Sequence, residues 1–239
     1  MDYFYVAPDR VGEGSLAIDG EEFSHLTHVM RKKIGDIVGV VDGTGNRYEA
    51  EIREIVRRSA HCTIRSHSVR PGEPRVRLHL GVGILKNSAR FDYLVEKATE
   101  LGVATVTPLL TTRTIPHHAK TDRWQKLALA AMKLAGRSIL PQIAGLTSLP
   151  DFLAGSPAES VRLIAHTDGP RGPLMIGGDA SELVACIGPE GGFTVDEIAL
   201  AGASGFSAVS LGPLRLRTET AALALTARVL AGEQDSARL

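Results

Sequence analysis

Residues 187–194 form the strongest candidate for a ligand-binding loop in this sequence. Ile187 ends an apolar run, the next five residues hold three glycines, a proline and Glu190, and Thr194 then opens a capping box with Glu197. In parallel α/β sheets, ligands bind beyond the carboxyl ends of strands, and glycines let the main chain approach them closely. A ligand-free turn needs fewer special residues, so we expect a binding site. The identity of the ligand stays open, because neither a dinucleotide-binding glycine fingerprint nor a P-loop lysine is present here.

A second loop, residues 211–221, places cations next to a predicted helix start. Thr218 is a suitable N-cap and Glu219 a favourable first-turn acid, which a purely structural interpretation explains well. That interpretation treats Arg215 and Arg217 as solvated side chains, yet the helix dipole disfavours positive charge at this end. The two arginines therefore suggest an anionic partner such as RNA phosphate.

Basic residues gather in groups although the chain carries no net charge, with 27 basic and 27 acidic side chains. One such group alone is usually a solvated face, but several in a neutral protein favour phosphate contacts. The groups are Arg53, Arg57, Arg58, Arg65, Arg70, Arg75 and Arg77; then Arg113, His117, His118, Lys120, Arg123 and Lys126; and a smaller one of His25, His28, Arg31, Lys32 and Lys33. His117 and His118 lack a third ligand nearby, so we expect no metal site.

The remaining composition favours a cytoplasmic protein without a membrane segment. The first residues lack the basic and apolar regions of a signal peptide, and no apolar run is long enough to cross a bilayer. Cys62 and Cys186 lie far apart in the sequence and read as buried thiols in a reducing compartment.

The sequence pattern changes near residue 70, which predicts two domains. Up to about residue 70 it is strand-like, with a hairpin turn at Asp42-Gly43 between residues 37–41 and 48–56, as in a small β-barrel. Residues 69–74 are polar and proline-rich and make a plausible linker. Beyond them, apolar strands alternate with amphipathic helices, which predicts a parallel sheet covered on both faces. The last helix is expected to begin at Thr218 and to end at Gly232.

The two loops, in this order, resemble the two signature loops of the SPOUT methyltransferases. The resemblance is closer to the family that methylates N3 of a uridine in small-subunit (16S) ribosomal RNA. Weaker matches to the same family run through most of the chain. They comprise His25 with residues 29–31, the turn at 41–43, Lys86, Arg90, Asp92, residues 97–103, and Gly136-Arg137 with Pro141. One departure is Lys133-Leu134-Ala135, where many members carry an acid, a glutamine and a small polar residue.

The resemblance implies a fold and a cofactor. It implies a PUA-like RNA-binding β-barrel over residues 1–72 and a SPOUT methyltransferase domain over residues 73–239, whose C-terminal segment forms a deep trefoil knot. It further implies S-adenosylmethionine as the cofactor, a C2 homodimer through the knot, and 16S rRNA within the assembled small ribosomal subunit as the partner.

The resemblance also carries roles onto individual positions. The implied cofactor-binding residues are His166, Gly188, Pro189, Glu190, Gly192, Leu211, Gly212, Leu214 and Leu216. The implied RNA-binding residues are His25, Arg31, Lys86, Arg90, Arg137 and Arg215.

The chemistry of uridine N3 suggests catalytic roles for Arg217 and Glu219. N3 carries a proton, so a general base or a cation near the ring oxygens would assist its attack on a methyl group. Glutamate would take or relay the proton and arginine would stabilise negative charge. Equally, Arg217 could hold phosphate while Glu219 fixes Arg217 or the knot. A SPOUT enzyme for another rRNA or tRNA site, and a non-catalytic RNA-binding assembly factor, remain the alternative functions.

Overall fold

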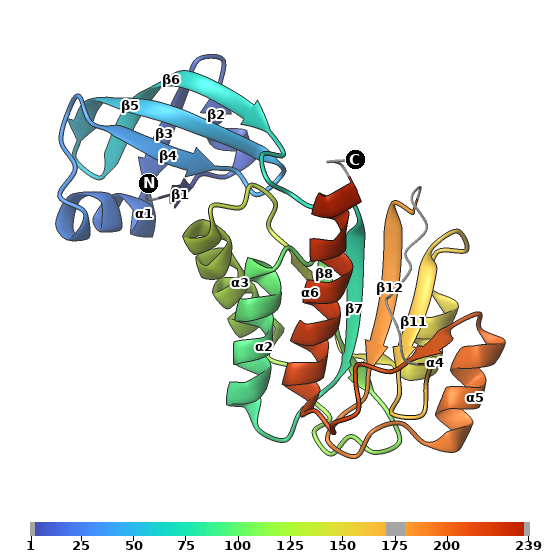
Figure 1. The fold of residues 1–239 in the computed structure, drawn as a ribbon. Coiled ribbons are helices and arrows are strands. Elements are labelled where there is room, and N and C mark those ends of the chain that lie inside the picture. Colours follow the sequence, from blue (N-terminus) through green and yellow to red (C-terminus); the bar gives the residue numbers. More distant parts are fainter. Residues whose placement is uncertain (1–2, 171–179, 237–239) are drawn as a thin grey trace. The chain divides into compact units, whose positions relative to one another are not determined.

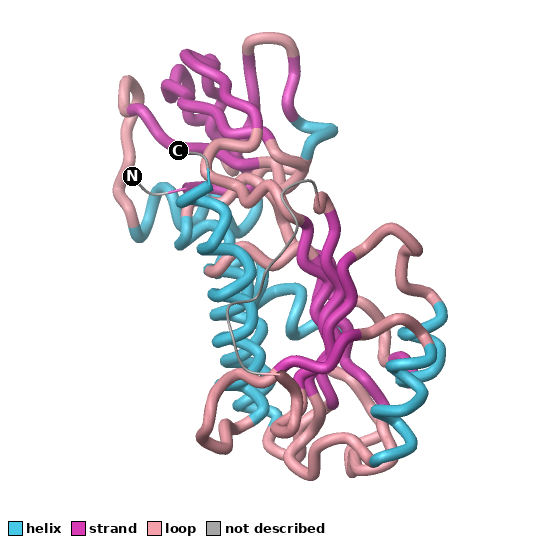
Figure 2. The backbone as a smooth tube through the Cα atoms, turned by 45° about the vertical axis from the view of Figure 1, so that its right-hand side comes forward, coloured by secondary structure: helices cyan, strands magenta, loops and turns pink. Residues whose placement is uncertain are grey.

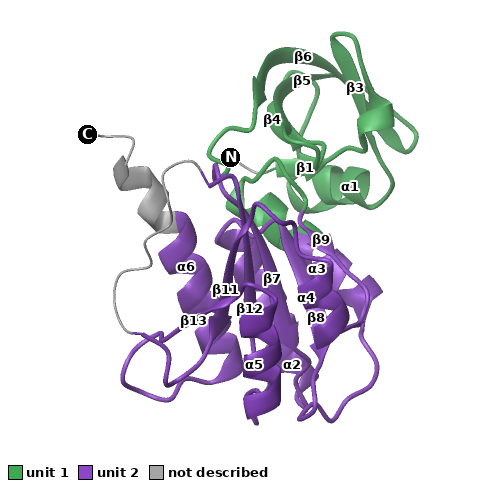
Figure 3. Ribbon diagram, turned by 90° about the vertical axis from the view of Figure 1, so that its right-hand side faces the viewer, with its two compact units in different colours: residues 1–73, 129–140 green, residues 74–128, 141–239 purple. Residues whose placement is uncertain are grey.

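The computed structural model describes residues 3–170 and 180–236. By its internal contacts the chain divides into two compact units (Figure 3). Residues 1–73 and 129–140 make up the first unit, and residues 74–128 and 141–239 the second. The first unit therefore includes the C-terminal half of helix α3 (Thr121–Ala135) and the segment that follows it.

The first unit is built on a six-stranded sheet with the strand order β1-β4-β5-β6-β3-β2. All its pairs are antiparallel except β1 with β4. Its strands are β1 (Tyr3–Tyr5), β2 (Val11–Gly12), β3 (Ser15–Asp19), β4 (Ile37–Val41), β5 (Asn46–Val56) and β6 (Ser59–Val69). A 3₁₀ turn at Pro8–Arg10, the short helix α1 (Gly20–Ser24) and a π-helical turn at His25–Val29 complete it. Phe4, Ile18, Leu26, Val40 and Ile52 are fully buried in its core.

The predicted hairpin turn is confirmed between β4 and β5. Asp42 is 3% exposed, and its carboxylate accepts hydrogen bonds from the main-chain N–H of Thr44 at 2.8 Å and from the side-chain amide of Asn46 at 2.7 Å. Gly43 adopts a positive φ of 77°, where glycine carries no steric cost. Sequence and structure agree here because the turn is encoded by adjacent residues.

The predicted linker is only partly a solvated spacer. Strand β6 extends to Val69, and Glu73, a few residues later, has a side chain that is only 1% exposed. Its carboxylate accepts hydrogen bonds from the main-chain N–H of Ser138 at 2.7 Å and of Ile139 at 3.0 Å, and it pairs with Arg137 at 2.8 Å. These contacts tie the end of the first segment to residues 137–139 within the same unit.

The second unit is an α/β domain whose seven-stranded sheet is parallel throughout, as predicted. Its strand order is β10-β8-β7-β12-β11-β13, with β9 also paired to β8. The strands are β7 (Arg77–Gly83), β8 (Thr105–Leu110), β9 (Gln142–Ile143), β10 (Thr147–Ser148), β11 (Val161–Ala165), β12 (Glu182–Ile187) and β13 (Ser207–Val209). The other helices are α2 (Ser88–Glu100), α4 (Leu149–Ala154), α5 (Val195–Ala203) and α6 (Thr218–Ser236).

Helices cover both faces of this sheet (Figures 1 and 2). On one face α6 packs against α2 and β7, and Phe91 of α2 stacks on Trp124 of α3 with ring centroids 4.2 Å apart. On the other face α4 and α5 contact each other over a core that includes Leu153, Val184 and Phe206. The buried faces explain why β7 and β12 are almost continuously apolar.

The order of the strands in the sheet differs from their order in the sequence around β12. Strand β12 lies between β7 and β11, whereas β13 lies at the edge beyond β11. From that edge, residues 210–217 lead to α6, which contacts β7 and β12 on the far side of β11. Such a switch point is where open parallel sheets bind ligands. The trefoil knot through this region stays a prediction from the resemblance.

One predicted boundary was wrong. The last helix continues past Gly232 to Ser236, because one glycine costs a helix only about 1 kcal/mol and does not end it alone. Among the described residues, no helix is long and apolar enough to cross a membrane.

Candidate active site

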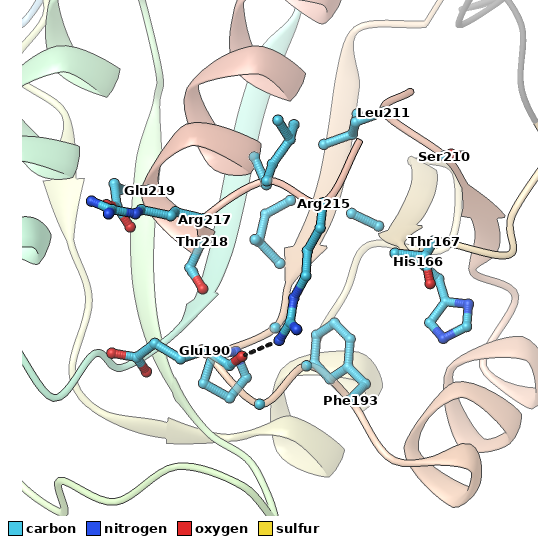
Figure 4. A pocket seen from close by; sticks show the side chains of 18 of the residues that line it. His166, Thr167, Glu190, Phe193, Ser210, Leu211, Arg215, Arg217, Thr218 and Glu219 are labelled. Carbon is cyan, nitrogen blue, oxygen red and sulfur yellow. Dashed lines mark hydrogen bonds between the residues drawn. The ribbon is translucent and has the colours of Figure 1, made fainter. Parts of the chain in front are cut away.

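A cavity of about 710 Å³ opens at the carboxyl ends of β11, β12 and β13 (Figure 4). Its walls come from the loop after β12, the loop after β13, the residues after β11 and the first turn of α6. The two loops singled out in the sequence therefore face one another across a single space. The volume lies in the range of small-molecule sites, about 300–1,000 Å³.

The loop after β12 is folded so tightly that it requires glycine. Its turn is closed by the main-chain N–H of Gly192, which donates to the carbonyl of Pro189 at 2.8 Å, and Gly192 has a positive φ of 69°. A Cβ on Gly188 would lie 3.0 Å from the main chain of Gly192. Glycine thus serves the shape of the loop as well as access to the cavity.

The loop after β13 offers main-chain donors to the cavity. Gly212 has a positive φ of 139°, and its N–H donates to the hydroxyl of Ser210 at 3.4 Å. Within the described part of the chain, no hydrogen bond engages the main-chain N–H of Leu214 or Leu216. Both residues line the cavity, and unpaired main-chain groups in such a place are ready to bind a ligand.

A carboxylate and arginines gather at the first turn of α6. Glu219 is buried, with its side chain 11% exposed, and its Oε1 lies 3.7 Å from Nε of Arg90 on α2. Arg217 is exposed and lines the same cavity beside Thr218 and Glu219 (Figure 4). Arg215 reaches the other loop, where its guanidinium donates to the carbonyl of Glu190 at 3.4 Å. The site therefore combines a held carboxylate with cations that face open space.

The residues after β11 form the third side of the cavity. The main-chain N–H of His166 donates to the carbonyl of Val209 at 2.9 Å, which joins the ends of β11 and β13. The ring of His166 accepts a hydrogen bond through Nδ1 from the N–H of Asp168 at 3.3 Å. His166 and Thr167 both line the cavity, as Figure 4 shows.

The structure brings most of the predicted site residues together. All of the residues expected to bind the cofactor line the cavity, and so do Arg90, Arg215, Arg217 and Glu219. Lys86 lies just outside, where its main-chain N–H donates to the carboxylate of Glu190 at 3.1 Å. The positions brought together come from four segments far apart in the sequence.

Three predicted RNA-binding residues lie in the first unit and not in this cavity. His25 begins the π-helical turn, with its ring centroid 5.8 Å from that of Phe4. Arg31 is exposed and has an unusual positive φ of 51°. Arg137 is only 8% exposed and its guanidinium is paired with Glu73. A buried, paired guanidinium has a structural role, so Arg137 does not enter our proposal as an RNA contact.

Sequence reasoning missed one residue that shapes the cavity and gave another a different role. A Cβ on Gly83, at the end of β7, would lie 2.4 Å from the nitrogen of Pro189, so only glycine lets β7 approach the loop. Arg113, expected to contact phosphate, instead donates to the carbonyls of Gly191 at 2.6 Å and Phe193 at 3.2 Å. Neither role leaves a local signal, because each depends on a segment about 80 to 100 residues away.

Comparison with known proteins identifies relatives along nearly the whole chain. The family described as "RNA methyltransferase domain" matches residues 72–230, and the one described as "RNA methyltransferase PUA domain" matches residues 18–65. The chain is 30% identical over 233 residues to "Ribosomal RNA small subunit methyltransferase E" of Synechocystis sp., covering 94% of this chain and 75% of the relative.

Solved structures agree with the sequence matches. The ribosomal RNA small subunit methyltransferase E of Neisseria gonorrhoeae, bound to S-adenosyl methionine, superposes with a TM-score of 0.87 at 29% identity, covering 97% of both chains. A probable rRNA-methyltransferase from Porphyromonas gingivalis superposes with a TM-score of 0.85 at 30% identity, covering 99% of both chains.

Proposed function

We propose that this chain, which belongs to the RNA methyltransferase family, transfers the methyl group of S-adenosylmethionine to N3 of a uridine in small-subunit (16S) ribosomal RNA. The observation that carries the proposal is the convergence of the two glycine-containing loops on one cavity that also holds Arg217 and Glu219. The relatives support the substrate class and the methyl transfer, and the residues that line the cavity support the roles proposed below.

The residues that line the cavity fit S-adenosylmethionine. Apolar side chains of Ile187, Leu211 and Leu216 suit the faces of an adenine ring, and the main-chain N–H groups of Leu214 and Leu216 suit its ring nitrogens. Glu190 and the main chain around Gly188 suit the polar end of the molecule. When bound, the cofactor supplies an electrophilic methyl group on sulfur.

Glu219 and Arg217 act on the uracil ring in this proposal. Glu219 takes the proton from N3, and Arg217 stabilises the negative charge that develops on the ring oxygens. Glu219 is buried and pairs with Arg90 at 3.7 Å. We therefore assign to Arg90, which the resemblance implied as an RNA contact, the role of positioning this carboxylate. Arg215 and Lys86, at the rim, contact the RNA backbone.

We further propose the context in which the reaction occurs. The substrate is the assembled small subunit in the cytoplasm, which the PUA-like unit binds through His25 and Arg31. The enzyme acts as a homodimer, with the C-terminal segment knotted at the interface. Sedimentation of the purified protein tests the dimer without any substrate.

The variant Arg217→Ala separates catalysis from binding. Loss of a cation that stabilises charge in the transition state should lower kcat about 100-fold or more, while affinities for S-adenosylmethionine and small subunits change little. Glu219→Gln should behave in the same way. The measurement is transfer of labelled methyl groups to small subunits from a strain that lacks this gene, beside filter binding of the same subunits.

Arg123→Ala is the matched control, since Arg123 pairs with Asp92 outside the cavity lining and should leave kcat unchanged. Transfer to tRNA or large-subunit RNA in preference to small subunits would reassign the substrate. Cofactor binding by the wild type with no transfer to any RNA would favour an assembly factor and refute the catalytic proposal.

A further inference from the structure

We infer that Arg113 is a positioning residue for the cofactor, because it fixes the loop after β12 in the shape that binds S-adenosylmethionine. The inference rests on the proposed function, and it assigns to Arg113 a task different from the phosphate contact that its basic neighbours suggest. Arg113 lies three residues beyond β8 and lines the cavity.

One nitrogen of Arg113 donates hydrogen bonds to two carbonyls of the loop after β12. Its Nη1 donates to the carbonyl of Gly191 at 2.6 Å and to that of Phe193 at 3.2 Å. A hydrogen bond from a charged donor is stronger than one between neutral groups. The stem of the side chain lies against Gly191, where a Cβ would be 3.1 Å from the Cβ and Cδ of Arg113. The guanidinium thus binds the protein's own main chain.

The same two peptide groups are held from their other side. The peptide that contains the carbonyl of Gly191 also contains the N–H of Gly192, which donates to Pro189 at 2.8 Å. The peptide that contains the carbonyl of Phe193 also contains the N–H of Thr194, which donates to Glu197 at 2.8 Å. Because a peptide group is planar, bonds at both ends fix its orientation.

The segment that carries Arg113 is itself anchored to the following helix. The main-chain N–H of Thr112 donates to Oε1 of Glu197 at 2.8 Å, and Glu197 is buried. Thr114 closes the segment through its hydroxyl, which donates to the carbonyl of Thr111 at 2.8 Å. Arg113 therefore projects from a rigid base onto the loop.

Fixing this loop in advance should favour cofactor binding. Glycine has more main-chain freedom to lose than any other residue, and this loop contains Gly188, Gly191 and Gly192. A loop ordered before the ligand arrives spares that loss on binding. Without Arg113, the peptides after Gly191 and Phe193 would each lose one of their two anchors.

The test uses Arg113→Met, which keeps an unbranched apolar stem and removes the donor. Affinity for S-adenosylmethionine, measured by calorimetry on the full chain, should fall about 10-fold to 100-fold. KM for the cofactor should rise to match, while kcat at saturating cofactor and KM for small subunits stay the same. Arg113→Gln, which is too short to reach both carbonyls, should show the same pattern, and Arg113→Lys should recover part of the affinity.

A second readout requires no cofactor and no activity. Hydrogen exchange of the Gly192 and Thr194 amides, followed by NMR in the ligand-free protein, should be faster in Arg113→Met than in the wild type. Arg123→Met is the matched control from the same basic group, and it should leave both exchange and affinity unchanged, because Arg123 pairs with Asp92.

Unchanged cofactor affinity and unchanged exchange in Arg113→Met and Arg113→Gln would overturn the inference. A higher KM for subunits with a normal KM for cofactor would do so as well, and would assign Arg113 to phosphate. If the wild type itself binds no S-adenosylmethionine, the proposed function fails, and the exchange experiment still decides whether Arg113 orders the loop.

Discussion

At the scale of single residues, the cavity depends on glycines that make room for the main chain of other segments. Gly83 ends β7 and contacts Pro189, and Gly188 allows the turn that closes at Gly192. The importance of Gly188 is visible in the sequence, because it lies among other glycines after an apolar strand. Gly83 lies at the end of an apolar strand that also contains Gly81, and its contact with a loop about 100 residues later has no local signature.

Gly83→Ala should weaken cofactor binding while the protein remains folded. The added Cβ would lie 2.4 Å from the nitrogen of Pro189, so the loop must move, and overpacking of this kind costs about 1–3 kcal/mol. We expect the dissociation constant for S-adenosylmethionine to rise about 10-fold or more, measured by calorimetry. Gly145→Ala is the control, since nothing lies within 4 Å of a Cβ there. Equal affinities in the two variants would contradict this reading of Gly83.

At the scale of elements, turns and helix starts that neighbouring residues specify were predicted well. Short elements that depend on packing against distant parts of the domain were not predicted. The capping box at Thr194 is confirmed at the start of α5, and the hairpin at Asp42-Gly43 is confirmed between β4 and β5, because each is specified by residues within one turn. Helix α4 and strands β9 and β10 were not predicted. These pieces are too short to be stable alone, so they form only because they pack on the rest of the domain.

Glu197 links α5 to the segment after β8, so Glu197→Ala should destabilise the second unit. The substitution leaves the main-chain N–H groups of Thr194 and Thr112 without their partners. We expect a loss of about 2–4 kcal/mol in the free energy of unfolding, measured by denaturant titration. Asp196→Ala, at an exposed position in the same helical turn, should cost less than about 1 kcal/mol. A similar loss in both variants would show that the helix dipole, and not the buried hydrogen bonds, accounts for the effect.

Arg137 and Glu73 join two distant segments of the first unit, and we expect their pairing to matter for stability. Arg137→Ala strands a carboxylate that is 1% exposed, which typically costs about 3–5 kcal/mol. The matched control is Arg10→Ala, because Arg10 pairs with Asp19 on the surface, where such pairs contribute about 1 kcal/mol or less. Thermal unfolding of both variants makes the comparison. Full stability of Arg137→Ala together with weaker RNA binding would restore the role expected from the sequence.

At the scale of the whole molecule, two of the features that determine function were accessible from the sequence alone. The alternation of strands and helices predicted the parallel sheet, which is confirmed, and the resemblance of the two loops to a known family implied that they share a site. The structure places both loops at one cavity. The phosphate contact expected of Arg113 rested on the clustering of basic residues alone. Such clustering does not distinguish an arginine that binds RNA from one that binds the main chain of its own protein. That distinction needs the position of the partner carbonyls.

Stability should also depend on pH through His79. Burial lowers the pKa of His79 below its usual value near 6.5. The negative charge of Glu182 raises this pKa, and the positive charge of Arg77 lowers it further. Below about pH 6.5 the unfolded chain binds a proton that the folded chain resists, so the free energy of unfolding should fall as the pH falls through this range. Denaturant titrations between pH 8 and pH 5 measure the slope. In His79→Gln the slope should be smaller, and an unchanged slope would assign it to other groups.

Identification of the methylated nucleoside tests the central claim most directly. Small subunits from a strain that lacks this gene are incubated with the purified protein and isotopically labelled S-adenosylmethionine, and the digested RNA is analysed by mass spectrometry. We expect labelled 3-methyluridine in the small-subunit RNA, and about 100-fold slower labelling in the reaction with Arg217→Ala. Label in any other nucleoside would contradict the assigned chemistry while leaving the fold and the cofactor in place.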